Sequence, residues 1–227
     1  MVQTNDGRRL LLFARLPEKG KVKTRLARAI GEEAACDLYR CLVADSLSLA
    51  RRSGYPTTVF YFPRTASPEV SLGLTCGFPC LPQTGRDLGE RMYNAFRTAF
   101  RDTGEAVLMG SDVPDLPPSF LDEAFEGLKG HDAVIGPAGD GGYYLIGFSS
   151  GALLSSPFSG MEWGGPSVFQ NTLRILRDHD LKVHVLPQWR DVDEYEDLSA
   201  LFDRLKGLPD GTLATIDFLR QRFHLLG

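Results

Sequence analysis

The stretch Ala106-Val107-Leu108-Met109-Gly110-Ser111-Asp112-Val113-Pro114-Asp115 carries most of the information about the fold. Its first four residues are an apolar run typical of a buried strand, and a helix is expected to begin near Pro118. Asp112 and Asp115 would then lie in a tight turn at the carboxyl end of that strand, where open α/β sheets bind their ligands. Carboxylates at this place suit Mg²⁺ or Mn²⁺, although an Asx turn before a proline would explain the same residues.

Apolar runs alternate with helical patterns along the whole chain, which predicts an α/β protein with a mostly parallel sheet flanked by helices. Besides Ala106–Met109, the expected strands are Leu10–Ala14, Thr57–Phe62, Asp132–Gly136, Gly142–Phe148 and Lys182–Leu186. The expected helices are Glu32–Arg52, Leu88–Asp102, Ser119–Leu128, Ser167–Arg177, Glu194–Lys206 and Thr212–Phe223, with Pro63–Pro79 irregular. We find no repeat or linker, so we expect residues 1–227 to form a single domain.

The segment Arg15–Leu26, with the sequence RLPEKGKVKTRL, leads from the first strand directly into a helix. It is strongly basic on a chain whose formal net charge is -4. A bend at a glycine, cations beside it and a helix N-terminus behind it suit a bound phosphate, while a solvated basic loop is the plainer alternative. Because this loop and Asp112 share one edge of the sheet, we expect it to bind phosphate. The residues we assign to this task are Pro17, Gly20, Lys21, Lys23 and Arg25.

Two more loops are expected at the same edge. Gln83, Asp87 and Leu88 precede or open a helix, where they either cap it or contact the base or ribose of a nucleotide. The glycine-rich turn between the fourth and fifth strands would let a ligand approach the backbone closely. We expect it to bind an acceptor or sugar through Asp140, Gly141, Gly142 and Tyr143.

Trp189-Arg190-Asp191-Val192-Asp193 follows the sixth strand. Asp193 is a natural helix N-cap, and the alternative is that Asp191 or Asp193 supplies a second metal carboxylate opposite Asp112. The four histidines are scattered and suggest no chemistry.

Composition narrows the class of protein. A negative net charge argues against bulk binding of nucleic acid or anionic membranes. Cys36, Cys41, Cys76 and Cys80 show no zinc-finger spacing, so we expect free thiols in a reducing compartment. The first apolar run is too short for a signal peptide or a membrane span. We therefore expect a cytoplasmic enzyme. The sequence does not determine its oligomeric state, and both a monomer and a homo-oligomer are compatible with it.

Taken in order, these segments resemble the DUF2064 family, whose members are often labelled glycosyltransferases of the GT-A fold and linked by name to arsenosugar biosynthesis. The segments that carry the resemblance are Phe13–Pro17 with Gly20, Val22–Leu26, Asp87–Met92, Gly110–Pro114, Asp140–Tyr143 and Asp191–Asp193. The family belongs to the nucleotide-diphospho-sugar transferase superfamily. The resemblance implies a Rossmann-like three-layer α/β/α fold that binds a nucleotide through Mg²⁺ or Mn²⁺.

In that superfamily pattern, Asp112 matches the metal-binding aspartate and Asp193 the acidic residue near the end of the domain, so both are expected metal ligands. Lys23 and Arg25 match the basic loop that related nucleotidyltransferases use on triphosphate, and with Asp112 they are the expected catalytic residues. The segment Trp163–Pro166 departs from the family pattern, and the two-aspartate DxD of common glycosyltransferases is missing around Asp112.

Three functions are consistent with these residues. The first is glycosyl transfer from a nucleotide-diphospho-sugar to a small acceptor, which we place ahead because of the family label. The second is nucleotidyl transfer from a nucleoside triphosphate to a phosphorylated small molecule, which the basic loop and the missing DxD favour. The third is a non-catalytic nucleotide-binding module, which would not need Asp112 and Asp193.

Overall fold

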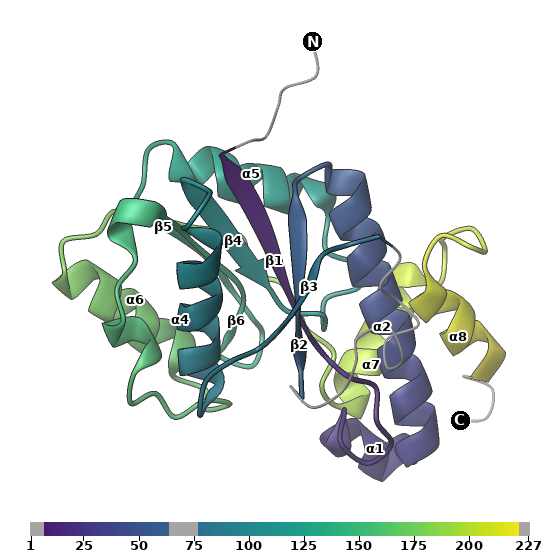
Figure 1. Cartoon of the computed structure of the whole chain (residues 1–227). Helices are drawn as coiled ribbons and strands as arrows, with labels where there is room; N and C mark the ends of the chain where they lie inside the picture. The colour runs from purple at the N-terminus through teal and green to yellow at the C-terminus, as the bar shows by residue number, and fades with distance from the viewer. Residues whose placement is uncertain (1–6, 64–76, 223–227) are drawn as a thin grey trace.

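The computed structural model describes residues 7–63 and 77–222. Its centre is a seven-stranded sheet in the order β3-β2-β1-β4-β6-β5-β7 (Figure 1). The strands are β1 (Arg8–Arg15), β2 (Thr57–Phe62), β3 (Cys80–Pro82), β4 (Glu105–Met109), β5 (Ala133–Pro137), β6 (Tyr143–Ser149) and β7 (Val183–Val185). β6 runs antiparallel to its neighbours β4 and β5, and the other strands run parallel to one another. The prediction of a mostly parallel sheet is therefore confirmed.

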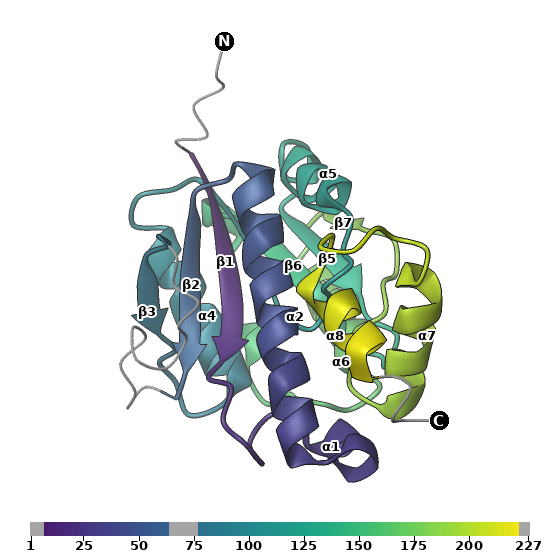
Figure 2. The same cartoon turned by 90° about the vertical axis from the view of Figure 1, so that its right-hand side faces the viewer.

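Helices cover both faces of this sheet, as the two views in Figures 1 and 2 show. One layer contains α2 (Glu32–Ser53), α5 (Pro118–Leu128), α7 (Tyr195–Leu205) and α8 (Ala214–Arg222). The opposite layer contains α4 (Leu88–Ala99) and α6 (Val168–Asp178). The short α1 (Thr24–Ile30) joins β1 to α2, and two 3-10 turns lie at Ser150–Ala152 and Ser156–Phe158. The fold is the Rossmann-like three-layer α/β/α arrangement.

Strand β1 explains why both faces are covered. Its side chains alternate across the sheet, so Leu10 and Leu12 pack into the core under α2 and α5, while Leu11 and Phe13 pack into the core under α4. These four residues are buried. A strand that is apolar at consecutive positions needs a helix layer on each side, which is the usual environment of a parallel sheet.

The sheet places the loops that follow its parallel strands at one edge, including the segment after β7. β1, β2, β4 and β5 all end there, because they run parallel within the sheet. β6 begins at the same edge, since it returns antiparallel beside β5 after a short turn. The segments that follow β1 and β4 and the β5–β6 turn are therefore brought together although they are far apart in the sequence.

Most expected elements are confirmed within a few residues. Strand β3 was not expected: it has three residues, ends at Pro82 and pairs with β2 at the sheet edge. The irregular stretch Pro63–Pro79 lies largely outside the described residues, as do Cys76 and the expected helical residue Phe223. Cys36, Cys41 and Cys80 are free thiols. In the part of the chain that the structure describes, no helix is long and apolar enough to cross a membrane.

Candidate functional site

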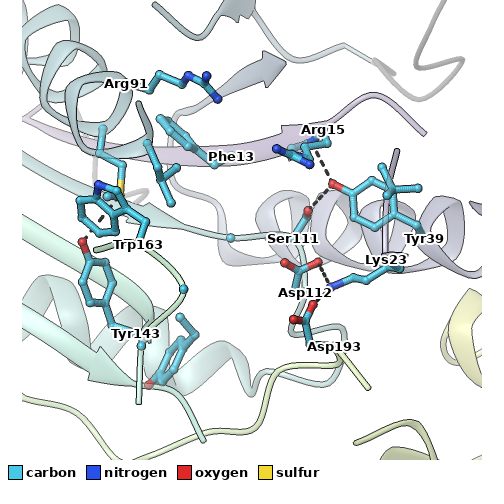
Figure 3. Close-up of a pocket in the computed structure, with 18 of the residues that line it drawn as sticks. Phe13, Arg15, Lys23, Tyr39, Arg91, Ser111, Asp112, Tyr143, Trp163 and Asp193 are labelled. Carbon is cyan, nitrogen blue, oxygen red and sulfur yellow. Dashed lines mark hydrogen bonds and ion pairs between the residues drawn. The ribbon is translucent and has the colours of Figure 1, made fainter. Parts of the chain in front are cut away.

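A pocket with a volume of about 520 Å³ opens at the carboxyl edge of the sheet (Figure 3). One wall comes from the end of β1 and the loop into α1, which supply Arg15, Lys21, Lys23 and Arg25. The floor is Gly110–Asp112, directly after β4. The opposite wall is more apolar and contains Leu88, Met92, Tyr143 and Trp163 together with Arg91. The pocket thus has a charged corner and an aromatic side.

The charged corner is an ion cluster of Lys23, Asp112 and Asp193. The Lys23 Nζ atom lies 2.7 Å from Asp112 Oδ1 and 3.3 Å from Asp193 Oδ1. The Lys23 side chain is only 4% exposed, whereas those of Asp112 and Asp193 are 41% and 38% exposed. One buried ammonium therefore holds two carboxylates that still face the pocket.

The charge state of Lys23 follows from this geometry. Burial by itself would lower its pKa, but the attraction of Asp112 and Asp193 outweighs burial and raises the pKa above its ordinary value. Lys23 is therefore a permanent cation. Its backbone is left-handed, with φ 47° and ψ 45°, at the N-cap of α1. A non-glycine residue is uncommon in this region, and such strain is found preferentially at functional sites.

Tyr39 and Ser111 form a buried support beneath the cluster. The Tyr39 hydroxyl accepts a hydrogen bond from the Arg15 backbone N–H at 2.8 Å and shares one with Ser111 Oγ at 3.0 Å. The Lys23 ammonium lies 6.0 Å from the centre of the Tyr39 ring. Burial raises the pKa of Tyr39 to about 12, so its hydroxyl stays protonated. These bonds tie α2 to the ends of β1 and β4.

Nine of the residues expected at the site line the pocket. They are Lys21, Lys23, Arg25, Gln83, Leu88, Asp112, Gly142, Tyr143 and Asp193. Arg25 lies 3.5 Å from Asp193 Oδ2 and 3.7 Å from Glu194 Oε1, at the solvent side of the cluster. Tyr143 packs edge-on against Trp163 at 6.4 Å between ring centres, and its hydroxyl faces Met92 Sδ at 3.8 Å.

Five other expected residues do not line the pocket, and each has a local structural contact. The Pro17 carbonyl accepts a hydrogen bond from Arg40, and Gly20 turns the loop at φ 74°. Asp87 caps α4 by accepting from the Glu90 N–H at 2.8 Å. Asp140 accepts from the Gly142 N–H at 2.8 Å in an Asx-type turn. Gly141 has a φ of 90°, and any Cβ there would collide with the carbonyl of Pro166.

The structure also decides two alternatives that the sequence left open. For Asp115 the sequence left a metal-facing carboxylate and a structural turn residue both open; its side chain is 6% exposed and bound to Trp189 Nε1 at 3.1 Å and to Arg204 Nε at 3.0 Å. Its task is to tie the β4 turn to α7. Asp191, an alternative second carboxylate, does not line the pocket. Burial raises its pKa to about 7, with repulsion from Asp140 and Asp112 adding to the effect.

Gln83 lines the pocket and also joins strands. It is buried, and its Nε2 donates to the carbonyl oxygens of Phe60 at 3.0 Å and Ala14 at 3.4 Å. The amide nitrogen is thus engaged by the ends of β2 and β1 rather than by a ligand.

Asp112 and Asp193 are the described residues best placed to hold a divalent cation. Asp112 Oδ1 is buried and, despite its closeness to Lys23, has no partner in hydrogen-bonding geometry. Among the residues that the structure describes, no group of three or more His, Cys, Asp or Glu side chains could hold a metal alone. Mg²⁺ typically binds one or two protein carboxylates and completes its coordination with substrate phosphates. Two carboxylates at the edge of an open pocket fit this pattern.

Tyr39, Ser111, Arg15 and Arg91 are among the pocket residues to which the sequence assigned no task. Tyr39 looks like an ordinary core residue of α2, and Ser111 like a turn residue. Arg15 and Arg91 belong to segments that were singled out, but neither was given a task. Their shared signal is position, because Arg15 ends β1 and Arg91 lies in the first turn of a helix that starts at the same edge.

Residues 42–165 match the family described as "Uncharacterized protein conserved in bacteria (DUF2064)". The chain belongs to this family. It is 39% identical to a protein from Desulfovibrio desulfuricans G20 that is provisionally described as a nucleotide-diphospho-sugar transferase, with 97% of each chain covered and a TM-score of 0.90. None of the curated proteins matches the chain.

More distant structures share the fold. A nucleotidyl transferase from Methanothermobacter thermautotroptrophicus is 14% identical, with 95% of this chain and 99% of that chain covered and a TM-score of 0.62. The Mycobacterium tuberculosis H37Rv protein Rv0371c, solved as a complex with manganese, is 15% identical, with 87% and 98% covered and a TM-score of 0.52. The DUF2064 chain is accordingly an enzyme of the transferase class.

Proposed function

We propose that this transferase uses a nucleotide donor with a divalent cation, and that its reaction is nucleotidyl transfer to a phosphorylated small molecule. This reverses the order in which the sequence ranked the two transfer reactions. The observation that carries the proposal is the composition of the pocket. Its described lining contains five cationic side chains but, as carboxylates, only Asp112 and Asp193, and both contact Lys23.

The lack of a free base separates the two reactions. An acceptor hydroxyl that attacks a sugar commonly needs a general base to remove its proton, and that base must lie within hydrogen-bonding reach. In the described lining of the pocket there is no histidine or glutamate, and no carboxylate beyond the two in the ion cluster. A phosphate acceptor needs no such base, because its oxygen is already an anion. The pocket therefore suits a phosphate nucleophile better than a hydroxyl.

The proposed step is balanced without any further reactant. An oxygen of the acceptor phosphate attacks the α-phosphorus of the nucleoside triphosphate and forms a new P–O bond. The bond from the α-phosphorus to the bridging oxygen breaks, and pyrophosphate leaves with the electron pair. Catalysis of such a transfer is mainly positioning and electrostatic stabilisation, for which a cationic pocket is suited.

Each residue of the charged corner has a task in this proposal. Asp112 and Asp193 would hold the cation, which when bound neutralises charge on the phosphates. Lys23 keeps the two carboxylates together; it donates one hydrogen bond to Asp193 Oδ1 and, since an ammonium has three donors, would have an N–H for a phosphate oxygen. Arg25 and Lys21 would bind the outer phosphates. The aromatic side of the pocket, with Tyr143 and Trp163, would hold the organic part of a substrate.

Glycosyl transfer is the second candidate, because the 39% identical relative carries the description nucleotide-diphospho-sugar transferase. In that reaction the same corner would bind the departing diphosphate. The aromatic side would then face the sugar.

Thermal-shift titration tests the proposal. We would compare the ribonucleoside triphosphates with nucleotide-diphospho-sugars, each with and without Mg²⁺ or Mn²⁺, on the wild type and Asp112→Asn. Nucleotidyl transfer predicts metal-dependent stabilisation by one triphosphate that Asp112→Asn loses. Stabilisation by a sugar nucleotide but by no triphosphate would select glycosyl transfer, and binding that is indifferent to metal would support a non-catalytic nucleotide-binding module.

A further inference from the structure

Two arginines in the pocket are not used by the charged corner. Arg15 ends β1, and Arg91 lies in the first turn of α4 (Figure 3). Both guanidinium groups lie near the ring of Phe62, the last residue of β2, with their central carbons 3.9 Å (Arg91) and 5.6 Å (Arg15) from the ring centre. The ends of β1 and β2 and the start of α4 thus place two cations beside one aromatic ring.

Among the residues that the structure describes, no carboxylate forms an ion pair with either of these cations. The hydrogen bonds of the two side chains go to backbone carbonyl oxygens, from Arg15 to Lys21 at 3.3 Å and from Arg91 to Gly85 at 3.4 Å. By contrast, Lys21, Lys23 and Arg25 in the same pocket each have at least one ion pair with a carboxylate. Two unpaired guanidinium groups facing one pocket leave a place for an anion.

The electrostatics agree with this geometry. Burial lowers the pKa of Arg91 and repulsion by Arg15 lowers it further, while the attraction of Asp87 offsets only part of these effects. Like charges held close together raise the free energy of the folded protein, and a bound anion would relieve that repulsion. Arginine is also the side chain best suited to phosphate, because its planar fork makes two parallel hydrogen bonds and its face stacks on aromatic rings.

We infer that Arg15 and Arg91 form the subsite for the phosphate group of the acceptor. This role rests on the proposed function, whereas the anion site itself does not. Arg91 projects from the wall that also carries Met92 and Trp163, and Figure 3 shows Arg91 well apart from the cluster of Lys23, Asp112 and Asp193. Arg15 lies between them. A donor held at the charged corner would therefore leave Arg91 free for a second anion.

The first test needs no nucleotide. Inorganic phosphate is titrated calorimetrically into the metal-free protein at low salt, for the wild type, Arg91→Gln and Arg15→Gln. The matched control is Arg97→Gln, because Arg97 lies on the same helix against the ring of Tyr93 and outside the pocket. Loss of one charge-assisted contact should weaken phosphate binding roughly tenfold or more in both pocket variants and not in the control.

The second test assigns the anion to the acceptor. Phosphate is titrated in the presence of Mg²⁺ and each of the four α,β-methylene ribonucleoside triphosphates. We expect the phosphate affinity to stay within about twofold of its value without nucleotide, and the triphosphate affinity to be unchanged in Arg91→Gln.

Several outcomes would overturn the inference. They are no phosphate binding by the wild type, equal binding by Arg91→Gln and Arg97→Gln when melting shows both folded, or competition between phosphate and triphosphate. Competition would assign the arginines to the donor. Absence of binding by every triphosphate would instead remove the proposed function, and with it the acceptor role, while the first titration still decides whether an anion site exists.

Discussion

Replacing Lys23 by methionine tests the ion cluster most directly. Removing one partner of a fully buried ion pair typically costs about 3–5 kcal/mol, because the other charge is left buried. Asp112 and Asp193 are 41% and 38% exposed, so water can solvate much of the charge that Lys23 releases. We therefore expect Lys23→Met to lower the free energy of unfolding by about 1.5–2.5 kcal/mol, roughly half of that cost. For a chain of this size that is a fall in Tm of about 3–10 °C.

Lys21→Met is the matched control. Lys21 lies in the same loop, but its side chain is 70% exposed and pairs with Glu18. Exposed pairs of this kind contribute about 0–1 kcal/mol, so the control should melt within about 4 °C of the wild type. Because the pKa of Lys23 is raised, its contribution is fully present below the ordinary lysine pKa of about 10.4 and is lost only as the pH rises through the higher folded value. The Lys23→Met deficit should therefore not shrink between about pH 6 and 9, and it should grow somewhat as Asp191 ionises, because Lys23 also lowers the pKa of Asp191.

The same variant predicts a change in metal response. Without Lys23, the two carboxylates share no cation, so Mg²⁺ should stabilise Lys23→Met more than the wild type when no nucleotide is present. A ligand at ten times its Kd stabilises a protein by about 1.4 kcal/mol, which differential scanning calorimetry resolves. Equal melting of Lys23→Met and Lys21→Met, or an Mg²⁺ response no larger in Lys23→Met than in the wild type, would refute the view that Lys23 holds the two carboxylates.

Three further substitutions test other parts of the molecule. Asp112→Asn should keep cooperative melting but lower Mg²⁺-dependent turnover of the nucleotide donor by about 10²–10³-fold; turnover within tenfold of wild type would contradict this. Asp45→Ala should cost about 1–2 kcal/mol in urea unfolding, because the buried carboxylate of Asp45 accepts two backbone N–H groups at the start of α8, each at 2.8 Å. Burial raises the pKa of Asp45, so the folded protein binds its proton more tightly than the unfolded chain, and the advantage over Asp45→Ala should be largest below about pH 4 and shrink as the pH rises. Gly89→Ala should destabilise by about 1–3 kcal/mol despite a better helix propensity, because its Cβ would lie 2.0 Å from the carbonyl oxygen of Phe158, whereas Gly130→Ala, with open space, should not.

The order of strands and helices could be predicted because each long element has a pattern of its own. The run Thr57–Phe62 is rich in β-formers and is bounded by turn residues, and the strand found there has the same bounds. Strand β3 could not be predicted this way. Three residues ending in Pro82 show no periodicity, and they form a strand only because β2 offers an unpaired edge.

The direction of β6 had a signal that the sequence analysis did not use. The turn between β5 and β6 spans only residues 138–142, which is far too short for the crossover that joins parallel strands. A short glycine-rich connection therefore requires an antiparallel pair. This hairpin brings Gly142 and Tyr143 back to the carboxyl edge, so the direction of β6 decides whether that turn can reach the pocket at all.

The candidate site shows where local reasoning stops. Asp112 and Asp115 are three residues apart in one turn, and nothing in the turn distinguishes them. What separates them is distant: Arg204, 89 residues further along the chain, binds Asp115 and turns it away from the pocket, while Lys23 binds Asp112. The sequence shows that a carboxylate of this turn could bind a metal. Which of the two aspartates faces the pocket depends on distant partners, Arg204 and Lys23, that only the fold brings near.

The left-handed backbone of Lys23 is the clearest example of such dependence. A lysine in this conformation costs roughly 1–2 kcal/mol, and no local pattern predicts it. The conformation persists because it places the ammonium between Asp112 and Asp193, where the attraction of two carboxylates outweighs both the strain and the burial. The strained residue is thus the one that joins the loop after β1 to the turn after β4 and to the segment before α7. Those three segments form the charged corner of the pocket. The strained backbone of Lys23 is therefore stabilised by the same carboxylates that would hold the donor.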